Sequence, residues 1–188
     1  GTMFADFIKP EFTYEYSNTT IDHDTKTVTL VFDITDKYFA SSTLTADDIE
    51  IRLGNVKAEN AKKTLTKLSD ITATVNGTAS TKIGEKYQLV VSDLEQGNGG
   101  DYSGIMTLAF KEGVALDKSE NKNLPKTLTI GIDDPTTGDG DDTGVIVDVV
   151  DPVWKTENIS IDGTTKTVKV DLIATDKYLT GVGNSSLT

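Results

Sequence analysis

The sequence predicts an all-β protein, built as an antiparallel β-sandwich and followed by the beginning of a second copy of the same unit. Three observations lead to this prediction. Apolar residues recur with a period of two rather than 3.6, and Gly- and Asn-rich stretches separate the apolar runs. In addition, a segment near the N-terminus recurs about 140 residues further along the chain.

The expected strands are short runs in which apolar and polar side chains alternate. The clearest run covers 28–34, where Thr, Val and Asp separate the apolar positions. Seven or so strands of this kind, joined by short turns, are typical of a sandwich of two sheets. The other strands that the alternation predicts most clearly cover 49–53, 87–91, 105–110 and 128–132.

Two stretches need a separate reading. The segment from Thr45 to Asp48 is suited to cap a single helical turn before the second strand. The stretch 56–84 is the least regular, and 57–68 fits either a short helix or an irregular excursion. The residues that the alternation places in the core include Val28, Leu30, Phe32, Leu89 and Ile130.

The internal repeat sets the expected organisation of the chain. Ile21–Val28 recurs as Ile161–Val168, and upstream Met3–Pro10 aligns with Val145–Pro152 through a shared Asp, a shared Pro and the same apolar pattern. The repeat predicts a complete unit at 1–134, a linker at 135–143 and the first third of a second unit at 144–188. We expect the chain to be a section of a longer tandem array.

A short motif within the repeat is kept without change. Thr35-Asp36-Lys37-Tyr38 recurs as Thr175-Asp176-Lys177-Tyr178. Repetition within one chain indicates a structural role common to both copies, so Asp36 and Tyr38 are predicted to anchor a loop. A second structural role is predicted for Tyr102, whose place just before the strand 105–110 resembles a tyrosine corner.

Three segments carry a resemblance to a known family. Ser42-Thr43-Leu44-Thr45-Ala46-Asp47-Asp48-Ile49 resembles the entry to a mid-domain strand in bacterial immunoglobulin-like repeats, and 87–94 together with Tyr102 is similar to their following strands. Asp117-Lys118-Ser119-Glu120-Asn121 resembles their Asp-x-x-Gly-Asn turn, with Glu120 in place of the Gly.

The resemblance carries implications for fold, role and location. It implies an immunoglobulin-like Greek-key sandwich that acts as a non-catalytic stalk or adhesive spacer in a large secreted or wall-attached bacterial surface protein. Its partners would be neighbouring repeats of the same protein, and surface proteins or glycans would be its ligands.

Composition excludes several other functions. The 188 residues include 18 Lys and Arg, 30 Asp and Glu and no Cys, for a net charge of −12. This charge would repel nucleic acid, and the lack of Cys removes disulfides and thiolate chemistry. No apolar run approaches the roughly 20 residues that span a bilayer. The single histidine, His23, stands where the second copy has Gly163, so we predict no enzymatic activity.

Calcium is the one cofactor that the sequence suggests. Seven Asp and no Lys or Arg lie between positions 133 and 151, and Ca²⁺ prefers carboxylate and carbonyl oxygens. The run from Asp139 begins like an EF-hand loop, but Val150 stands where the bidentate acid belongs. The alternatives are an interdomain calcium site and a solvated, self-repelling acidic linker. The candidate ligands are Asp133, Asp134, Asp139, Asp141 and Asp151.

Aromatic residues suggest an alternative function as a carbohydrate-binding module. Tyr14 and Tyr16 alternate on one predicted strand, and the second copy has Trp154 at the position of Tyr14. Such rings can stack on sugars, although core packing explains the same alternation. The second copy also carries an apolar face that includes Val168, which we expect to pair with another chain, giving self-association, or with the first repeat.

Overall fold

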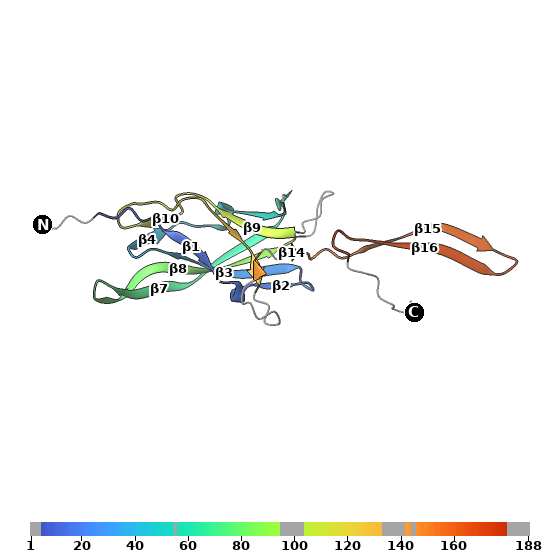
Figure 1. Cartoon of the computed structure of the whole chain (residues 1–188), viewed down its shortest axis with the longest axis horizontal. Helices are drawn as coiled ribbons and strands as arrows, with labels where there is room; N and C mark the ends of the chain where they lie inside the picture. The colour runs from blue at the N-terminus through green and yellow to red at the C-terminus, as the bar shows by residue number, and fades with distance from the viewer. Residues whose placement is uncertain (1–4, 55, 95–103, 133–141, 144–145, 180–188) are drawn as a thin grey trace. The chain divides into compact units, whose positions relative to one another are not determined.

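The computed structural model describes residues 5–54, 56–94, 104–132, 142–143 and 146–179. These residues form an all-β protein with antiparallel sheets, compatible with a β-sandwich, and contain no α-helix. Two short 3₁₀ turns, η1 (Tyr16–Asn18) and η2 (Ala46–Asp48), interrupt the strands. The chain divides into two compact units, Gly1–Val149 and Val150–Thr188, which are described separately (Figure 1).

The first sheet of the first unit has the strand order β1-β3-β8-β7, and β2 also pairs with β3. Its central strand β3 alternates without a break, so every second side chain is buried between the sheets. Burial on one face and partial exposure on the other explain why this strand is so clear in the sequence. The strands of this sheet are β1 (Glu11–Tyr14), β2 (Thr20–Asp22), β3 (Thr27–Thr35), β7 (Lys62–Val75) and β8 (Thr78–Ser92).

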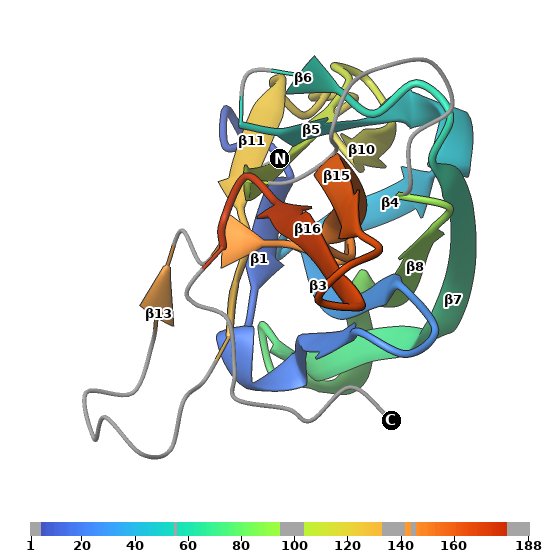
Figure 2. The ribbon, with the colours of Figure 1, turned by 90° about the vertical axis from the view of Figure 1, so that its right-hand side faces the viewer.

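The second sheet has the order β11-β9-β5-β6, and β14 pairs with β9 beyond the end of β11. A short antiparallel pair, β4 (Phe39–Ser42) with β10 (Ala115–Asp117), lies beside these sheets. Figure 2 views the unit along its length, with β5, β6 and β11 in its upper part and β3 and β7 lower down. The strands of the second sheet are β5 (Ile49–Leu53), β6 (Val56–Lys57), β9 (Gly104–Phe110), β11 (Lys126–Thr129) and β14 (Ile146–Val147).

The core contains side chains from both sheets. Phe12 of β1 stacks on Phe110 of β9 with ring centroids 4.3 Å apart, and Phe32 of β3 meets Phe110 edge-on at 4.9 Å. Aromatic pairs of this kind add to the free energy gained by burying apolar area. The prediction of the core is confirmed, because the following residues are all at most 1% exposed: Val28, Leu30, Phe32, Leu89 and Ile130.

Strand β7 corrects the prediction for the irregular stretch. Both alternatives for 57–68, a short helix and an irregular excursion, are wrong, because Lys62–Val75 is one long strand paired with β8. It lies at the end of the sheet order, and most of its side chains are exposed on both faces. One face is partly buried near Leu65 and from Ile71 to Val75, but the exposed run 66–70 interrupts the alternation, so the period-two signal was weak.

The Asp-rich stretch lies between strands of the first unit. β12 (Gly131–Ile132) and β13 (Asp142–Thr143), which flank positions 133–141, pair with each other, and β14 then returns to β9. Val147 and Val149 are 0% and 3% exposed and belong to the core of this unit. The sequence repeat assigns them to the second copy, whereas the compact first unit extends to Val149.

The second unit is described as a two-stranded hairpin, β15 (Val153–Asp162) with β16 (Thr167–Thr175). Its turn has the same hydrogen bonds as the turn between β2 and β3. Asp162 Oδ1 accepts from the backbone N–H of Thr164 and Thr165, as Asp22 Oδ1 does from the two corresponding residues. The face that is buried in β3 is open here, and Val168 is 63% exposed.

Glu120 has an unusual backbone conformation in the turn after β10. Its φ is +66°, in the left-handed region that glycine favours, and the related turn motif has Gly at this position. A non-glycine residue in this conformation destabilises the folded state by about 1–2 kcal/mol. A glycine removes this strain, but it also raises the conformational entropy of the unfolded chain, which offsets part of the gain. We expect Glu120→Gly to stabilise the first unit by about 0.5–1 kcal/mol in urea unfolding.

The neighbouring Lys118 provides the control for this prediction, because it is exposed in the same turn and has no positive φ. Lys118→Gly should destabilise the unit by about 0.5–1 kcal/mol, the ordinary cost of a glycine. Equal losses in both variants would contradict the view that the turn is strained at Glu120.

Candidate metal centre

Three aspartates from separate parts of the chain meet at one end of the first unit. Asp6 lies in the extended segment before β1, Asp36 directly follows β3, and Asp117 ends β10. One carboxylate oxygen of each lies within 4.8 Å of those of the other two. Figure 1 shows the entering segment on the same side of the unit as β4 and β10.

Asp36 is positioned by the tight turn between β3 and β4. Its Oδ1 accepts a hydrogen bond from the Tyr38 backbone N–H at 2.7 Å, and its own N–H donates to Ile83 O at 2.8 Å. Gly84 permits this close approach of β8, because a Cβ there would lie 2.1 Å from the Ile34 carbonyl oxygen. The repeated Asp-Lys-Tyr motif therefore places a carboxylate at the end of a buried strand.

Asp117 is fixed by the turn that follows it. Its Oδ1 accepts from the backbone N–H groups of Ser119 and Asn121, each at 2.8 Å, and its Oδ2 accepts from Asn121 Nδ2 at 2.7 Å. Burial acts to raise the pKa of Asp117, but the hydrogen bonds donated by Asn121 and Ser119, together with one shared with the Asp6 side chain, outweigh it and hold the pKa below its usual value. Asp117 is therefore a buried carboxyl group whose two oxygens are held by donors of its own turn.

Asn121 also fastens the entering segment to the body of the unit. Its Nδ2 donates to the backbone oxygens of Asp6 and Ile8 at 2.8 and 3.3 Å, and Asp6 Oδ1 accepts from the Ile8 N–H at 3.0 Å. The segment that carries Asp6 is thus held in place by contacts between polar groups rather than by strand pairing.

The electrostatics of this cluster are unfavourable without a counter-charge. Asp36 is 7% exposed, and its Oδ2, like that of Asp6, is buried without a hydrogen-bond partner. Burial and the negative charges of Asp117, Asp6 and Glu11 raise the pKa of Asp36 above its ordinary value, although the Tyr38 N–H acts against this. Within the described part of the chain, no Lys or Arg forms an ion pair with the three carboxylates.

The residues predicted from sequence for a calcium site are placed elsewhere. Asp133, Asp134, Asp139 and Asp141 lie outside the described residues, so the interdomain site stays a prediction. Asp151 is exposed at the start of the second unit. Tyr102, predicted to form a tyrosine corner, also lies outside the described residues.

Tyr38 lies next to the new cluster. Its backbone oxygen accepts from the N–H of Lys118, which joins the turn after β3 to the turn after β10. Its hydroxyl accepts from Asn76 Nδ2 at 3.2 Å. These contacts are of the loop-anchoring kind that the repeated motif predicts.

Tyr14 and Tyr16 do not form one flat surface. Tyr14 is half-buried against the core, its hydroxyl donates to Gly131 O at 2.7 Å, and a short contact joins it to Thr19 Oγ1. Its ring meets that of Tyr16 edge-on, at an angle of 84°. Trp154, in the second unit, is 58% exposed. A sugar cannot stack on Tyr14 and Tyr16 together, because perpendicular rings share no plane.

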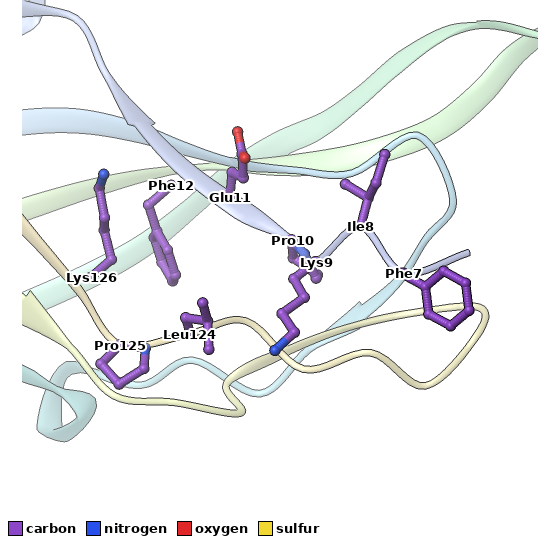
Figure 3. Close-up of a pocket in the computed structure, with 9 residues that line it drawn as sticks. All are labelled: Phe7, Ile8, Lys9, Pro10, Glu11, Phe12, Leu124, Pro125 and Lys126. Atoms are coloured by element: carbon purple, nitrogen blue, oxygen red, sulfur yellow. The ribbon is translucent and has the colours of Figure 1, made fainter. Parts of the chain in front are cut away.

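A shallow groove follows the entering segment toward β1. Figure 3 shows Phe7 and Ile8 at one end of it, with Leu124 and Pro125 of the loop before β11 on the facing side. Phe7 and Ile8 are 86% and 71% exposed. The groove presents apolar surface with charges at its rim, and His23 lies elsewhere, exposed in the turn between β2 and β3.

No family model, characterised protein or solved structure matches this chain. Across the described ranges, none of the secondary structure is a helix of the length and apolar character needed to cross a bilayer. The class of protein must therefore be argued from the fold, the internal repeat and the aspartate cluster.

Proposed function

We propose that this chain is a non-catalytic, immunoglobulin-like structural repeat that serves as a stalk or spacer in a bacterial surface protein. The strand orders β1-β3-β8-β7 and β11-β9-β5-β6 support the immunoglobulin-like part of the proposal. They correspond to the orders A-B-E-D and G-F-C that define this type of sandwich, with β6 added beside the strand that corresponds to C.

The main support for the proposal is strand β14 at the end of the first unit. By sequence, 146–149 belongs to the leader of the second copy, yet β14 pairs with β9, and Val147 and Val149 complete the core. The chain enters the second unit directly after these buried residues. Only 150–152 separate the last buried residue of the first unit from β15, which is the short connection that a tandem spacer requires.

The entering segment shows the complementary half of this arrangement. Phe7 aligns with Val149 in the repeat, but it is 86% exposed. Large exposed apolar side chains indicate an interaction surface. We infer that a preceding repeat covers this segment, which makes a neighbouring repeat the main partner of the unit.

The carbohydrate-binding alternative receives less support. Tyr14, the first-unit counterpart of Trp154, packs against the core and donates its hydroxyl proton to the backbone. In the complete first unit this position is therefore part of the packing around the core. Trp154 is exposed because the described part of the second unit is only a hairpin with an open face.

Stretching single molecules of the whole chain tests the spacer function. We expect the first unit to resist and then unfold in one step that includes 146–149, which releases roughly 460–500 Å of extended chain. If the unit ended at 134, the step would be roughly 50 Å shorter. A chain that lengthens gradually without a force peak would contradict a mechanical role.

A further inference from the structure

We propose that Asp6, Asp36 and Asp117 bind one Ca²⁺ ion, which fastens the segment entering the unit to the body of the sandwich. The site draws on three segments: the leader before β1, the end of β3 and the end of β10. The pairing of Glu11 with Thr35 brings the first two side by side, whereas β10 pairs only with β4. The inference stands apart from the spacer function, because it concerns the first unit alone.

The cluster is more than a group of neighbouring acids. Asp36 is more than nine-tenths buried, and its Oδ2 finds no donor although its Oδ1 is hydrogen-bonded. The same holds for Asp6. Its Oδ1 accepts a hydrogen bond from the Ile8 N–H, whereas its Oδ2 is buried and has no hydrogen-bond donor. Buried carboxylate oxygens without donors are costly, and a cation bound between them removes that cost.

The donor set selects a hard cation. All three side chains offer oxygen, and the chain has no Cys and a single His, which lies in the turn between β2 and β3. Calcium takes six to eight oxygen ligands in flexible geometry, whereas Mg²⁺ demands a near-ideal octahedron and keeps its waters. Three carboxylates from irregular segments suit Ca²⁺, with water completing the shell on the half-exposed side of Asp6.

The carboxylates are held in place before an ion arrives. Backbone N–H groups orient each one: Tyr38 for Asp36, Ser119 and Asn121 for Asp117, and Ile8 for Asp6. Ligands fixed by such partners lose little entropy on binding.

The second copy repeats two of these residue types. Asp176 aligns with Asp36, whereas Asp148, which aligns with Asp6, lies between the core residues Val147 and Val149 of the first unit. Asp176 Oδ1 accepts from the Tyr178 N–H at 2.7 Å, the same bond and length as at Asp36. Most of the residues that align with β3 differ, whereas Asp36 is kept at its end.

The test compares thermal unfolding of the full chain and of Asp36→Asn, stripped with EDTA and then titrated to 10 mM CaCl₂. Wild type should gain about 5–10 °C in Tm, as expected for a Kd of about 0.1 mM. Asp36→Asn removes one of three mutually repelling charges, so without calcium it should melt above wild type. With calcium it should gain little, so that the order of the two melting temperatures reverses.

Controls separate this site from the Asp-rich stretch and from a folding defect. Asp139→Asn removes the same charge there and should keep the full calcium response. Asp6→Asn, outside the sheets, should lose the response even if Asp36→Asn folds poorly, and MgCl₂ should raise Tm less than CaCl₂. If the Tm of wild type does not rise at 10 mM CaCl₂, the proposal is overturned. This is the result expected if a proton shared between the carboxylates takes the place of the ion. An equal calcium response in wild type and both site variants would overturn the proposal too.

Discussion

Replacing Val147 with Asp should destabilise the first unit by about 4 kcal/mol or more, because the variant places an unpaired charge in the core. Val147 is fully buried beside β9. The adjacent Ile146 is 47% exposed on the same strand and has its side chain on the opposite face. Ile146→Asp adds the same charge at the neighbouring position, and it should cost less than about 1 kcal/mol.

Urea unfolding followed by the fluorescence of the aromatic residues measures both variants. A large loss at Val147 and a small loss at Ile146 would show that 146–149 is an integral strand of the first unit. If the unit ended at 134, both substitutions would lie in a solvated segment, and their effects would be equal and small. That outcome would also remove the main support for direct coupling between successive units.

The sequence predicts strands well where one face is buried and the other is not. β3 alternates between buried and partly exposed residues, so its period of two is unmistakable, and the core residues that it implies are all buried. β7 is partly buried on one face only toward its two ends, and the exposed run 66–70 breaks the pattern. Val147 and Val149 were hidden for another reason, because the repeat assigns them to the following copy and the Asp-rich stretch resembles a linker.

The candidate metal centre was only partly visible in the sequence. Asp36 stands out through the repeated motif, Asp6 through its identity with Asp148, and Asp117 through its turn. Nothing in the sequence shows that these acids meet, because they are far apart in the chain and belong to three segments. The density of Asp between 133 and 151 is the stronger pattern in the sequence, whereas burial, which makes an unpaired carboxylate costly and favours a bound cation, is not visible there.

The two main inferences concern opposite ends of one unit. At one end, Val147 and Val149 bind the departing chain into the core. At the other, Asn121 and the proposed ion fasten the arriving chain to the turns after β3 and β10. A unit held at both ends transmits tension through its sheets rather than through loose segments, and calcium would control only the arriving end.

Val28 and Val168 allow the same substitution to be made at equivalent positions of the two copies. Val28 is 0% exposed in the complete first unit, whereas Val168 is 63% exposed in the hairpin. Val28→Asp should therefore cost about 4 kcal/mol or more and leave the first unit largely unfolded. Val168→Asp should change the free energy of unfolding of that unit by less than about 0.5 kcal/mol.

Sedimentation velocity on the same two variants tests what covers the open face of β15 and β16. We expect wild type to associate through this face, since Val168 and its neighbours Val170 and Leu172 expose apolar surface that the first copy buries. Val168→Asp should convert the associated chain to monomers while the first unit still melts normally. If Val168→Asp instead lowers the free energy of unfolding by several kcal/mol, the face is buried within a single chain. A wild type that stays monomeric at every concentration would contradict the association.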